Sequence, residues 1–475
     1  MIAVVRSRSR TRVFVLLVVV LILLVVGPLI YLGWRQSARG VQVVSALPRL
    51  IGHKAQLTLT LQAARGNITR AEVRIVQAGK STVVAKQETP LGPRGDVPVT
   101  IDSAGLGLRE GGATFEVWAR DDYWRPLKLR EGAAVSAPIT IDLTPPKVEV
   151  IASTQYLSPG GAGVVVYRVS GANREAVTLG TRRFSGTPLG PPENNLRVAL
   201  VALPYDWTSS TPLSVTAEDE AGNVGARGVP VEIKPRRFPH DRIEIKDTFL
   251  QLKVPELLPQ YPPGKSLIEG FLVINRDQRK QAEEEKLRIG SKSADKPLWE
   301  GAFEQPRNTK VFSNFAETRT YFYQGREIDT QVHYGYDLAS TKQSPIPVAN
   351  KGVVVFAGPL TIYGNTVIVD HGLGLMTLYG HLSSIDVKAG DAMTKGQELG
   401  RSGSTGLAIG DHLHYEVLVH GISVTPLEWW DAKWIRDRIS KPLKAAGLPE
   451  IVGAETRDQE PKGEAAAGSR RGRRR

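Results

Sequence analysis

Residues 400–417, GRSGSTGLAIGDHLHYEV, hold the pattern that decides the fold of the C-terminal part of the chain. The last eight residues place His412 and His414 one residue apart, within a Tyr-Glu-Val continuation that is typical of a strand. Successive side chains of a strand alternate between its two faces, so these two imidazoles share one face. They either bind a metal there or are polar residues on the solvent side of a sheet, and the pair alone leaves both interpretations open.

The composition is that of a globular protein with several domains. A chain of 475 residues is too long for one hydrophobic core, and it suggests about three domains of ~150 residues each. The sequence has no cysteine, which excludes a disulfide framework and a thiolate zinc site. Any metal would therefore be bound by His, Asp or Glu.

The excess of positive charge is concentrated at the two ends of the chain, whose formal net charge is +13. Most of that charge comes from nine arginines, which are Arg6, Arg8, Arg10, Arg12, Arg470, Arg471, Arg473, Arg474 and Arg475. The sequence therefore indicates no basic folded surface, and we expect no nucleic-acid partner.

Residues 13–34, VFVLLVVVLILLVVGPLIYLGW, are uncharged and long enough to cross a bilayer, for which ~20 apolar residues suffice. A cleaved signal peptide would have a shorter apolar region of ~7 to 15 residues and a small-residue cleavage site, which the following RQSARG lacks. We therefore expect a single transmembrane helix in the cytoplasmic (inner) membrane. Arginines precede it, so residues 1–12 should be a basic cytoplasmic segment, with the bulk of the chain in the periplasm or extracytoplasmic space.

Two β-sandwich modules are expected at residues 40–144 and 145–236, because short alternating runs there are separated by Gly, Pro and Asn. A weak repeat supports two modules, since VWARD at residues 117–121 recurs as VTAED at residues 215–219. The segments resemble bacterial immunoglobulin-like modules, notably in AEDEAGN. They could serve as an arm that binds a partner protein, or simply as a stalk.

The remaining regions differ in character. Residues 240–299 are expected to be a helical or linker segment. Its charged run RDQRKQAEEEK is typical of a solvated helix face, but it could also belong to a docking or occluding helix at about 264–290. The β pattern returns at residues 300–434. Residues 450–475, rich in Gly, Ala, Glu and Arg, are typical of a disordered tail.

The eight histidines fall into two sets. Those without an acidic or histidine partner at ligand spacing, or placed before a glycine at a strand end, are expected to be structural or surface residues: His53, His240, His371 and His420. The other set comprises the opening pair, His333 in VHYGYDL with an aspartate four residues later, and His381 in TLYGHLS.

Catalytic zinc sites commonly take three protein ligands and leave the fourth position to water. Two histidines and one aspartate from these motifs could supply three ligands, which leaves two histidines. Hydrolysis needs such residues, because one neutral imidazole can accept a proton from the water and another can stabilise the charge of the tetrahedral intermediate.

Together the motifs closely resemble those of the lysostaphin-like, or LytM-type, zinc metallopeptidases. The resemblance rests on H-x-x-x-D, on Tyr-Gly-His-Leu, and on the opening stretch with its H-x-H, in this order and spacing, and it covers about residues 300–430. It implies an all-β peptidase domain, a barrel-sandwich hybrid, in which zinc is bound by His333, Asp337 and His414. It also implies that His381 and His412 act on the water and the transition state, with His412 as the general base.

Two local departures concern the edge of the cleft. The lead-in NFAETR has Ala316 where the family usually has glycine, and the charged insert YQGREIDTQ precedes the first histidine. None of the five site positions departs from the family pattern, unlike in its metal-free members. The glycines of the opening stretch, Gly400, Gly403, Gly406 and Gly410, could make a cleft wall or a plain turn.

By this resemblance the chain is expected to be a zinc-dependent endopeptidase that cuts stem peptides or crosslinks of peptidoglycan. A membrane-anchored regulator or scaffold that recruits or activates other cell-wall hydrolases is the alternative. A biotinyl- or lipoyl-type carrier, suggested by VKAGDAMTKGQELG, is disfavoured because Thr394 separates Met393 from Lys395 and the histidines would have no role.

Overall fold

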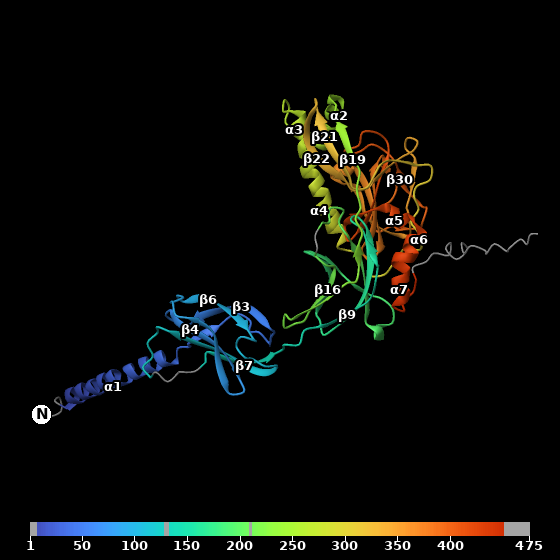
Figure 1. The fold of residues 1–475 in the computed structure, drawn as a ribbon. Coiled ribbons are helices and arrows are strands. Elements are labelled where there is room, and N and C mark those ends of the chain that lie inside the picture. Colours follow the sequence, from blue (N-terminus) through green and yellow to red (C-terminus); the bar gives the residue numbers. More distant parts are fainter. Residues whose placement is uncertain (1–6, 128–132, 209–210, 451–475) are drawn as a thin grey trace, which may run out of the picture. The chain divides into compact units, whose positions relative to one another are not determined.

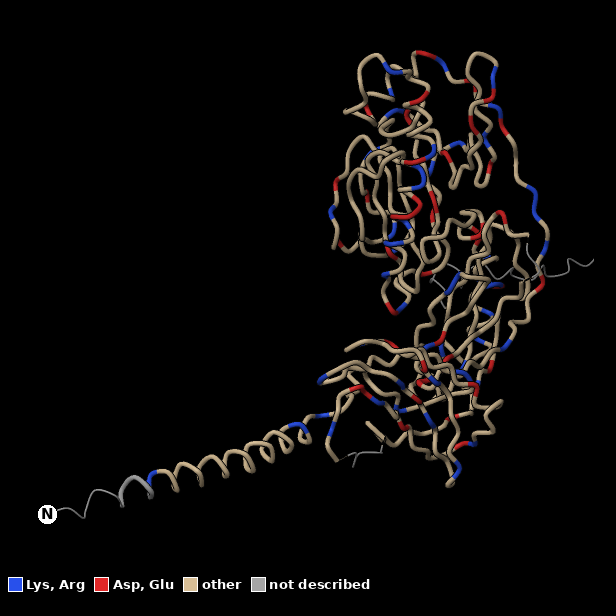
Figure 2. The backbone as a smooth tube through the Cα atoms, turned by 90° about the vertical axis from the view of Figure 1, so that its left-hand side faces the viewer, with Lys and Arg blue, Asp and Glu red and all other residues tan. Residues whose placement is uncertain are grey.

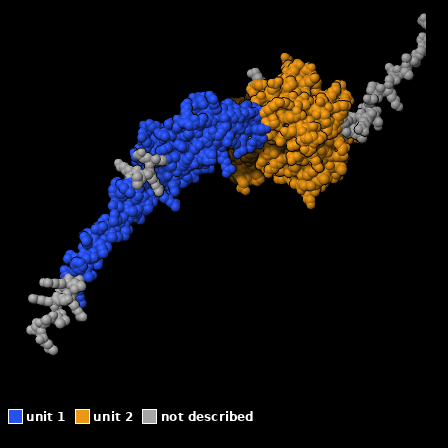
Figure 3. Space-filling view, turned by 90° about the horizontal axis from the view of Figure 1, so that it is seen from below, with its two compact units in different colours: residues 1–146, 171–173, 218–225 blue, residues 147–170, 174–217, 226–475 orange. Residues whose placement is uncertain are grey.

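The computed structural model describes residues 7–127, 133–208 and 211–450, and its fold is mainly β, which confirms the predicted class (Figure 1). The chain divides into two compact units, coloured separately in Figure 3. Unit 1 comprises residues 1–146 with the short segments 171–173 and 218–225, and unit 2 comprises the rest. Residues 1–6 of the predicted cytoplasmic segment and residues 451–475 of the predicted tail lie outside the described residues.

Unit 1 begins with α1 (Ser7–Ser37), a single long apolar helix. Its segment Arg12–Ser37 has a mean hydropathy of 3.4 and is not buried against the rest of the protein. In Figure 2 most of this helix carries no charged residue. By length and composition it could cross a membrane as an anchor, and a signal sequence would share these properties.

The strands of unit 1 form two sheets that enclose one hydrophobic core. One sheet has the order β1-β3-β6 and the other β2-β8-β7-β4-β5. Alternation explains the core, because Ala71, Val73 and Ile75 of ITRAEVRIVQ are all fully buried. The strands are β1 (Val41–Val43), β2 (Leu50–Ile51), β3 (Lys54–Ala63), β4 (Ile68–Gln77), β5 (Lys80–Gln87), β6 (Arg94–Asp102), β7 (Gly111–Asp121) and β8 (Val135–Ile141).

A second pair of sheets, with orders β14-β15-β11-β9 and β13-β12-β16-β17, follows along the chain. The strands are β9 (Lys147–Ser153), β10 (Tyr156–Leu157), β11 (Ala162–Ser170), β12 (Arg174–Leu179), β13 (Arg182–Phe184), β14 (Thr187–Pro188), β15 (Leu196–Ala202), β16 (Ser214–Glu218), β17 (Val224–Gly228) and β18 (Glu232–Ile233). The immunoglobulin-like character of both pairs of sheets stays a prediction.

Within unit 2, the sheet containing β11 is held against the C-terminal helices. Thr425 donates its backbone N–H to Gly160, and Glu428 accepts from the backbone N–H of Ala162 at 2.9 Å. Glu428 also pairs with Arg236 at 3.1 Å. These helical segments are α5 (Pro426–Trp430), α6 (Ala432–Ile435), a π-helical turn (Arg436–Ser440) and α7 (Lys441–Ala445).

The C-terminal half of unit 2 is built on one large sheet. Its order is β20-β23-β31-β27-β26-β25-β29, with β32 paired to β31, and the smaller sheets β19-β21-β22 and β24-β30-β28 accompany it. The strands are β19 (His240–Glu244), β20 (Lys310–Ser313), β21 (Glu317–Tyr323), β22 (Arg326–His333), β23 (Tyr336–Ala339), β24 (Pro345–Pro347), β25 (Gly352–Pro359), β26 (Asn365–Gly372), β27 (Leu375–Leu382), β28 (Ser384–Ile385), β29 (Ala392–Met393), β30 (Glu398–Arg401), β31 (Leu413–Val419) and β32 (Ile422–Val424).

The helical segment before this sheet packs onto it. It consists of α2 (Asp247–Leu257), α3 (Leu267–Val273), a π-helical turn (Ile274–Gln278) and α4 (Arg279–Gly290). Apolar residues of these helices and of the strands share one core: Leu250, Val254, Phe271, Ala282 and Ile289 meet Ile368, Met376, Leu378 and Leu418. The helices therefore cover one face of the sheet, and the segment is not a free linker.

His371 belongs to this domain as a fully buried core residue. Its Nδ1 donates to the carbonyl oxygen of Lys351 at 2.6 Å, and its Nε2 accepts from the Thr377 hydroxyl at 2.8 Å. Burial lowers the pKa of His371 to about 4, so the ring is neutral at neutral pH.

This burial predicts a pH-dependent stability. The folded-state pKa of His371 lies below the unfolded value of ~6.5, so only the unfolded state binds the proton between these values. The stabilisation is complete above pH 6.5 and is lost as the pH falls toward 4, by up to ~3 kcal/mol. In urea titrations from pH 7 to 4.5, His371→Gln should show a shallower decline than the wild type and than the exposed control His53→Gln. Equal slopes for all three proteins would contradict this prediction.

Candidate metal centre

Strand register brings two of the predicted ligands together. In the antiparallel pair β23–β31, Asp337 lies directly opposite His414. His333 is the last residue of β22, one tight turn before β23. All three side chains are at least nine-tenths buried, and their ligand atoms lie within 4.8 Å of one another. They form a group that could bind a metal ion.

The distances within the group are short. Nε2 of His333 lies 3.0 Å from both Asp337 Oδ1 and His414 Nδ1, and His414 Nδ1 lies 2.9 Å from the same carboxylate oxygen. Outside the group, His333 Nδ1 donates to the Asn314 carbonyl at 2.9 Å, and His414 Nε2 donates to Glu416 at 2.9 Å. These outer hydrogen bonds fix which nitrogen of each ring faces inward.

This donor set fits a cation. With their outer nitrogens protonated, the neutral rings turn the lone pairs of His333 Nε2 and His414 Nδ1 toward each other and toward a carboxylate. Such an arrangement is repulsive unless a proton or a metal ion lies among the three atoms. Two imidazoles and one carboxylate are also a common ligand set for zinc.

The surrounding charges shape the protonation of the group. Burial lowers the pKa of His333, which keeps that ring in its neutral, metal-binding form. For His414, burial lowers the pKa but hydrogen bonds to Asp337 and Glu416 outweigh it, so the pKa is raised. The position of His414 Nδ1 therefore concentrates negative potential, which favours a bound positive charge.

The turn between β22 and β23 requires a glycine at position 335. A Cβ atom added there would lie 2.5 Å from the Tyr415 carbonyl oxygen and 2.8 Å from His414 Nε2. Any side chain would therefore displace β31, which carries His414. The glycine between the two motif residues allows His333 and Asp337 to converge on His414.

The two remaining motif histidines lie beside this group. The rings of His381 and His412 are 4.8 Å apart, and His412 Nε2 lies 3.5 Å from Asp337 Oδ1. Each ring donates Nδ1–H to a backbone carbonyl, to Thr405 from His381 at 2.8 Å and to Gly410 from His412 at 2.7 Å. Both Nε2 atoms are therefore acceptors. His381 also has a φ of +63°, a strained conformation of the kind that clusters at functional sites.

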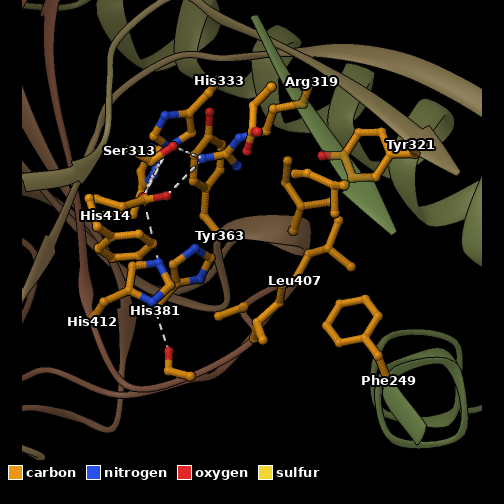
Figure 4. A pocket seen from close by; sticks show the side chains of 18 of the residues that line it. Phe249, Ser313, Arg319, Tyr321, His333, Tyr363, His381, Leu407, His412 and His414 are labelled. Atoms are coloured by element: carbon orange, nitrogen blue, oxygen red, sulfur yellow. Dashed lines mark hydrogen bonds and ion pairs between the residues drawn. The ribbon is translucent and has the colours of Figure 1, made fainter. Parts of the chain in front are cut away.

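A cleft of about 500 Å³ opens onto all five predicted site residues. Figure 4 shows the four histidine rings on one side of it, with Phe249, Tyr321 and Leu407 on the other. Phe249 comes from α2, and Arg279 at the start of α4 also lines the cleft. The helical segment thus forms a wall of the cleft and leaves its interior open.

The glycine-rich stretch also contributes to the wall of the cleft. Its residues 407–411 line the cleft. Gly403 and Gly406 approach neighbouring backbone so closely that an added Cβ would lie within 2.5 Å of it, whereas Gly410 has open space around it. The stretch is therefore a tightly packed turn at Gly403 and Gly406, and its later residues line the cleft. It has features of both a plain turn and a cleft wall.

Three residues of the site were missed from the sequence. Glu416, on the same face of β31 as His414, accepts from that ring, and Arg319 donates to Asp337 Oδ2 at 2.9 Å. Lys286 of α4 contacts Glu416. Alternation along the strand signals Glu416, but no sequence pattern signals the other two. Ala316, noted as a departure, has a φ of +57°, a conformation that glycine adopts without strain.

Comparison with known proteins agrees with this geometry. Residues 331–426 match the model of Peptidase family M23. The chain is 42% identical over 96 residues to the peptidoglycan DD-endopeptidase ShyA of Vibrio cholerae. The aligned segment covers 20% of this chain and 22% of that protein. The chain is also 38% identical over 97 residues to the DD-carboxypeptidase/endopeptidase Mpg of Neisseria meningitidis, covering 20% and 22%. The chain thus matches about a fifth of the length of these relatives.

Solved structures with similar parts include a putative M23 peptidase from Pseudomonas aeruginosa, at 22% identity and a TM-score of 0.36, covering 58% of this chain and 95% of that one. The catalytic domain of lysostaphin from Staphylococcus simulans is 28% identical with a TM-score of 0.23, covering 26% and 92%. From the family match in residues 331–426, which contains His333, Asp337, His381, His412 and His414, we conclude that the chain carries a LytM-type domain of peptidase family M23.

Proposed function

We propose that the chain is a zinc-dependent endopeptidase that hydrolyses peptide bonds in peptidoglycan. The observation that carries this proposal is the convergence of three buried side chains with ligand atoms, those of His333, Asp337 and His414, in the wall of a cleft. The names of the relatives support the substrate, because one matched segment belongs to a protein described as a peptidoglycan DD-endopeptidase and another to a DD-carboxypeptidase/endopeptidase.

In this proposal His333 Nε2, Asp337 Oδ1 and His414 Nδ1 hold the zinc ion. A bound zinc ion would supply Lewis acidity, which lowers the pKa of water and polarises the carbonyl to be attacked. Arg319, hydrogen-bonded to the outer oxygen Oδ2 of Asp337, keeps Oδ1 directed at the group.

His412 is the general base in this proposal. Its Nε2 is an acceptor, because its Nδ1–H is used by Gly410. A proton taken from the attacking water would make an imidazolium, which the Asp337 carboxylate 3.5 Å away stabilises. The same ring can then return the proton to the leaving amine.

His381 acts on the transition state in this proposal. Burial and the neighbouring histidines lower its pKa, so the ring begins neutral and orients water through its accepting Nε2. The neutral ring can then stabilise the tetrahedral adduct by accepting, through the same Nε2, a hydrogen bond from the hydroxyl that the attacking water leaves on the adduct. The hydrogen bond to Thr405 holds the ring in place for this role.

The proposal predicts different outcomes for the neighbouring histidines. Zinc-loaded full-length chain in detergent should release new amino termini from purified peptidoglycan. His414→Ala should lose both zinc and activity. His412→Ala should keep its zinc but lose activity by roughly 100-fold or more, the usual contribution of a general base. His53→Ala, an exposed histidine, should match the wild type.

A regulator or scaffold without peptidase activity would give a different result. If the zinc-loaded wild type releases no amino termini, or if His412→Ala is as active as the wild type, the endopeptidase proposal is wrong.

We also propose that α1 anchors the chain in the cytoplasmic membrane, with the N-terminus in the cytoplasm and the bulk of the chain outside. The helix is apolar and exposed over its membrane-length segment, and arginines precede its apolar residues. Cell-wall enzymes remain candidate partners of the two sandwich-like pairs of sheets.

The lack of native cysteines makes this topology directly testable. In intact spheroplasts, a membrane-impermeant maleimide should label Ser81→Cys, an exposed position beyond α1, and should not label Ser9→Cys before permeabilisation. The chain should also stay with the membrane pellet after carbonate washing. Labelling of Ser9→Cys in intact spheroplasts, or loss of the first residues by cleavage, would contradict the anchor.

A further inference from the structure

Helix α4 sends one charged side chain into the interior beneath the candidate metal centre. The Lys286 side chain has no solvent exposure, although it belongs to the charged run of the sequence. Its ammonium lies 2.8 Å from Glu416 Oε2, 2.8 Å from Glu283, 3.0 Å from the Tyr363 hydroxyl and 3.1 Å from the Ser423 hydroxyl. An ammonium with four polar neighbours belongs to a buried polar network, so this side chain does not lie on the solvated face of α4.

Through Glu416, Lys286 is connected to His414 of the candidate metal centre. The carboxylate of Glu416 is fully buried and divides its oxygens between two partners. Oε2 accepts from Lys286 and from the Ser423 hydroxyl, the latter at 2.7 Å, and Oε1 accepts from His414 Nε2 at 2.9 Å. This is the arrangement of a carboxylate that orients a metal-binding imidazole, with a lysine behind it.

Lys286 compensates the burial of the Glu416 carboxylate. A carboxylate removed from water is costly unless an opposite charge and hydrogen bonds compensate it. Lys286 contacts two acids of different exposure. Glu283 is partly exposed and also accepts from the Tyr363 hydroxyl at 3.0 Å, whereas Glu416 is fully buried. Without Lys286, the Glu416 carboxylate would lose the ammonium that holds Oε2 in this position.

The backbone of α4 is fixed against the turn that follows the ligand strand. A Cβ added to Gly290 would lie 2.2 Å from the backbone nitrogen of Gly421, and one added to Gly421 would lie 2.5 Å from the carbonyl oxygen of Lys286. The two main chains therefore touch with no room for side chains. This contact fixes the distance that the Lys286 side chain spans between α4 and Glu416.

We propose that Lys286 is a positioning residue of the metal centre, which acts on His414 through the carboxylate of Glu416. The inference rests on the proposed zinc-binding function and deepens it. Residues 279–290 lie before the segment 331–426 that matches the peptidase family, yet they complete the support of a ligand within it. The metal-binding unit of this chain therefore includes α4.

Zinc affinity measured on the full-length chain by competition with a chromophoric chelator tests this proposal. Lys286→Met should bind zinc about 10-fold more weakly than the wild type, at the lower end of the effect expected for outer partners of a metal ligand. Lys280→Met is the matched control, because Lys280 lies on the same helix with its side chain 79% exposed and should leave the affinity unchanged.

The double variant Lys286→Met with Glu416→Gln separates positioning from a merely structural role. The glutamine oxygen can still accept from His414 Nε2, and the fully buried charge of Glu416 is removed together with that of Lys286. The affinity should therefore return to within about three-fold of the wild type, the equivalent of one neutral hydrogen bond. A structural role alone would lower the melting temperature of the metal-free protein without changing zinc affinity, and that outcome would overturn the proposal.

Ser423→Ala provides a second, milder variant in case Lys286→Met does not fold. It removes one hydrogen bond to Glu416 Oε2 and leaves α4 in place. The zinc affinity should fall about three-fold, and an unchanged affinity would count against the proposal. If the wild type itself binds no zinc, the proposed function fails, whereas equal binding by all variants refutes only the role of Lys286.

Discussion

The structure of the site depends on the register between β23 and β31. Because Asp337 pairs with His414 across two antiparallel strands, a carboxylate and an imidazole meet without any loop having to hold them. A shift by one residue would turn each side chain to the opposite face and would bury Leu413 or Tyr415 in the site instead. The register itself is fixed by the core beneath it, where Tyr415 stacks on Trp430 and lies against Tyr379.

The helices before the sheet give this chain a site that is larger than the matched family segment. They cover the face of the sheet that carries His414 and Glu416, and they supply apolar residues to the cleft wall. One segment therefore stabilises the sheet, shapes the cleft and contacts Glu416, the hydrogen-bond partner of His414. These three roles are joined in α4, whose first residue, Arg279, lines the cleft and whose Lys286 is buried beside Glu416.

The sequence allowed the mainly β class, the apolar N-terminal helix and the family resemblance to be predicted. Strand alternation put His412 and His414 on one face, and the same rule extended by two residues would have identified Glu416. The role of Lys286 could not be predicted, because a dense charged run is normally solvated and only tertiary packing against Gly421 buries this one lysine. The packing of the helical segment against the sheet was only one of two interpretations of the charged run, because a π-helical turn at Ile274–Gln278 interrupts the spacing of its apolar positions.

X-ray absorption spectroscopy at the zinc edge, on the zinc-loaded full-length chain, tests most directly whether the three converging side chains are the metal ligands. The account predicts nitrogen and oxygen ligands with outer-shell scattering from two imidazole rings, unchanged when His381 or His412 is replaced by alanine. Scattering from three or more rings would contradict it. So would a spectrum that is lost on replacement of His412 but retained on replacement of His414.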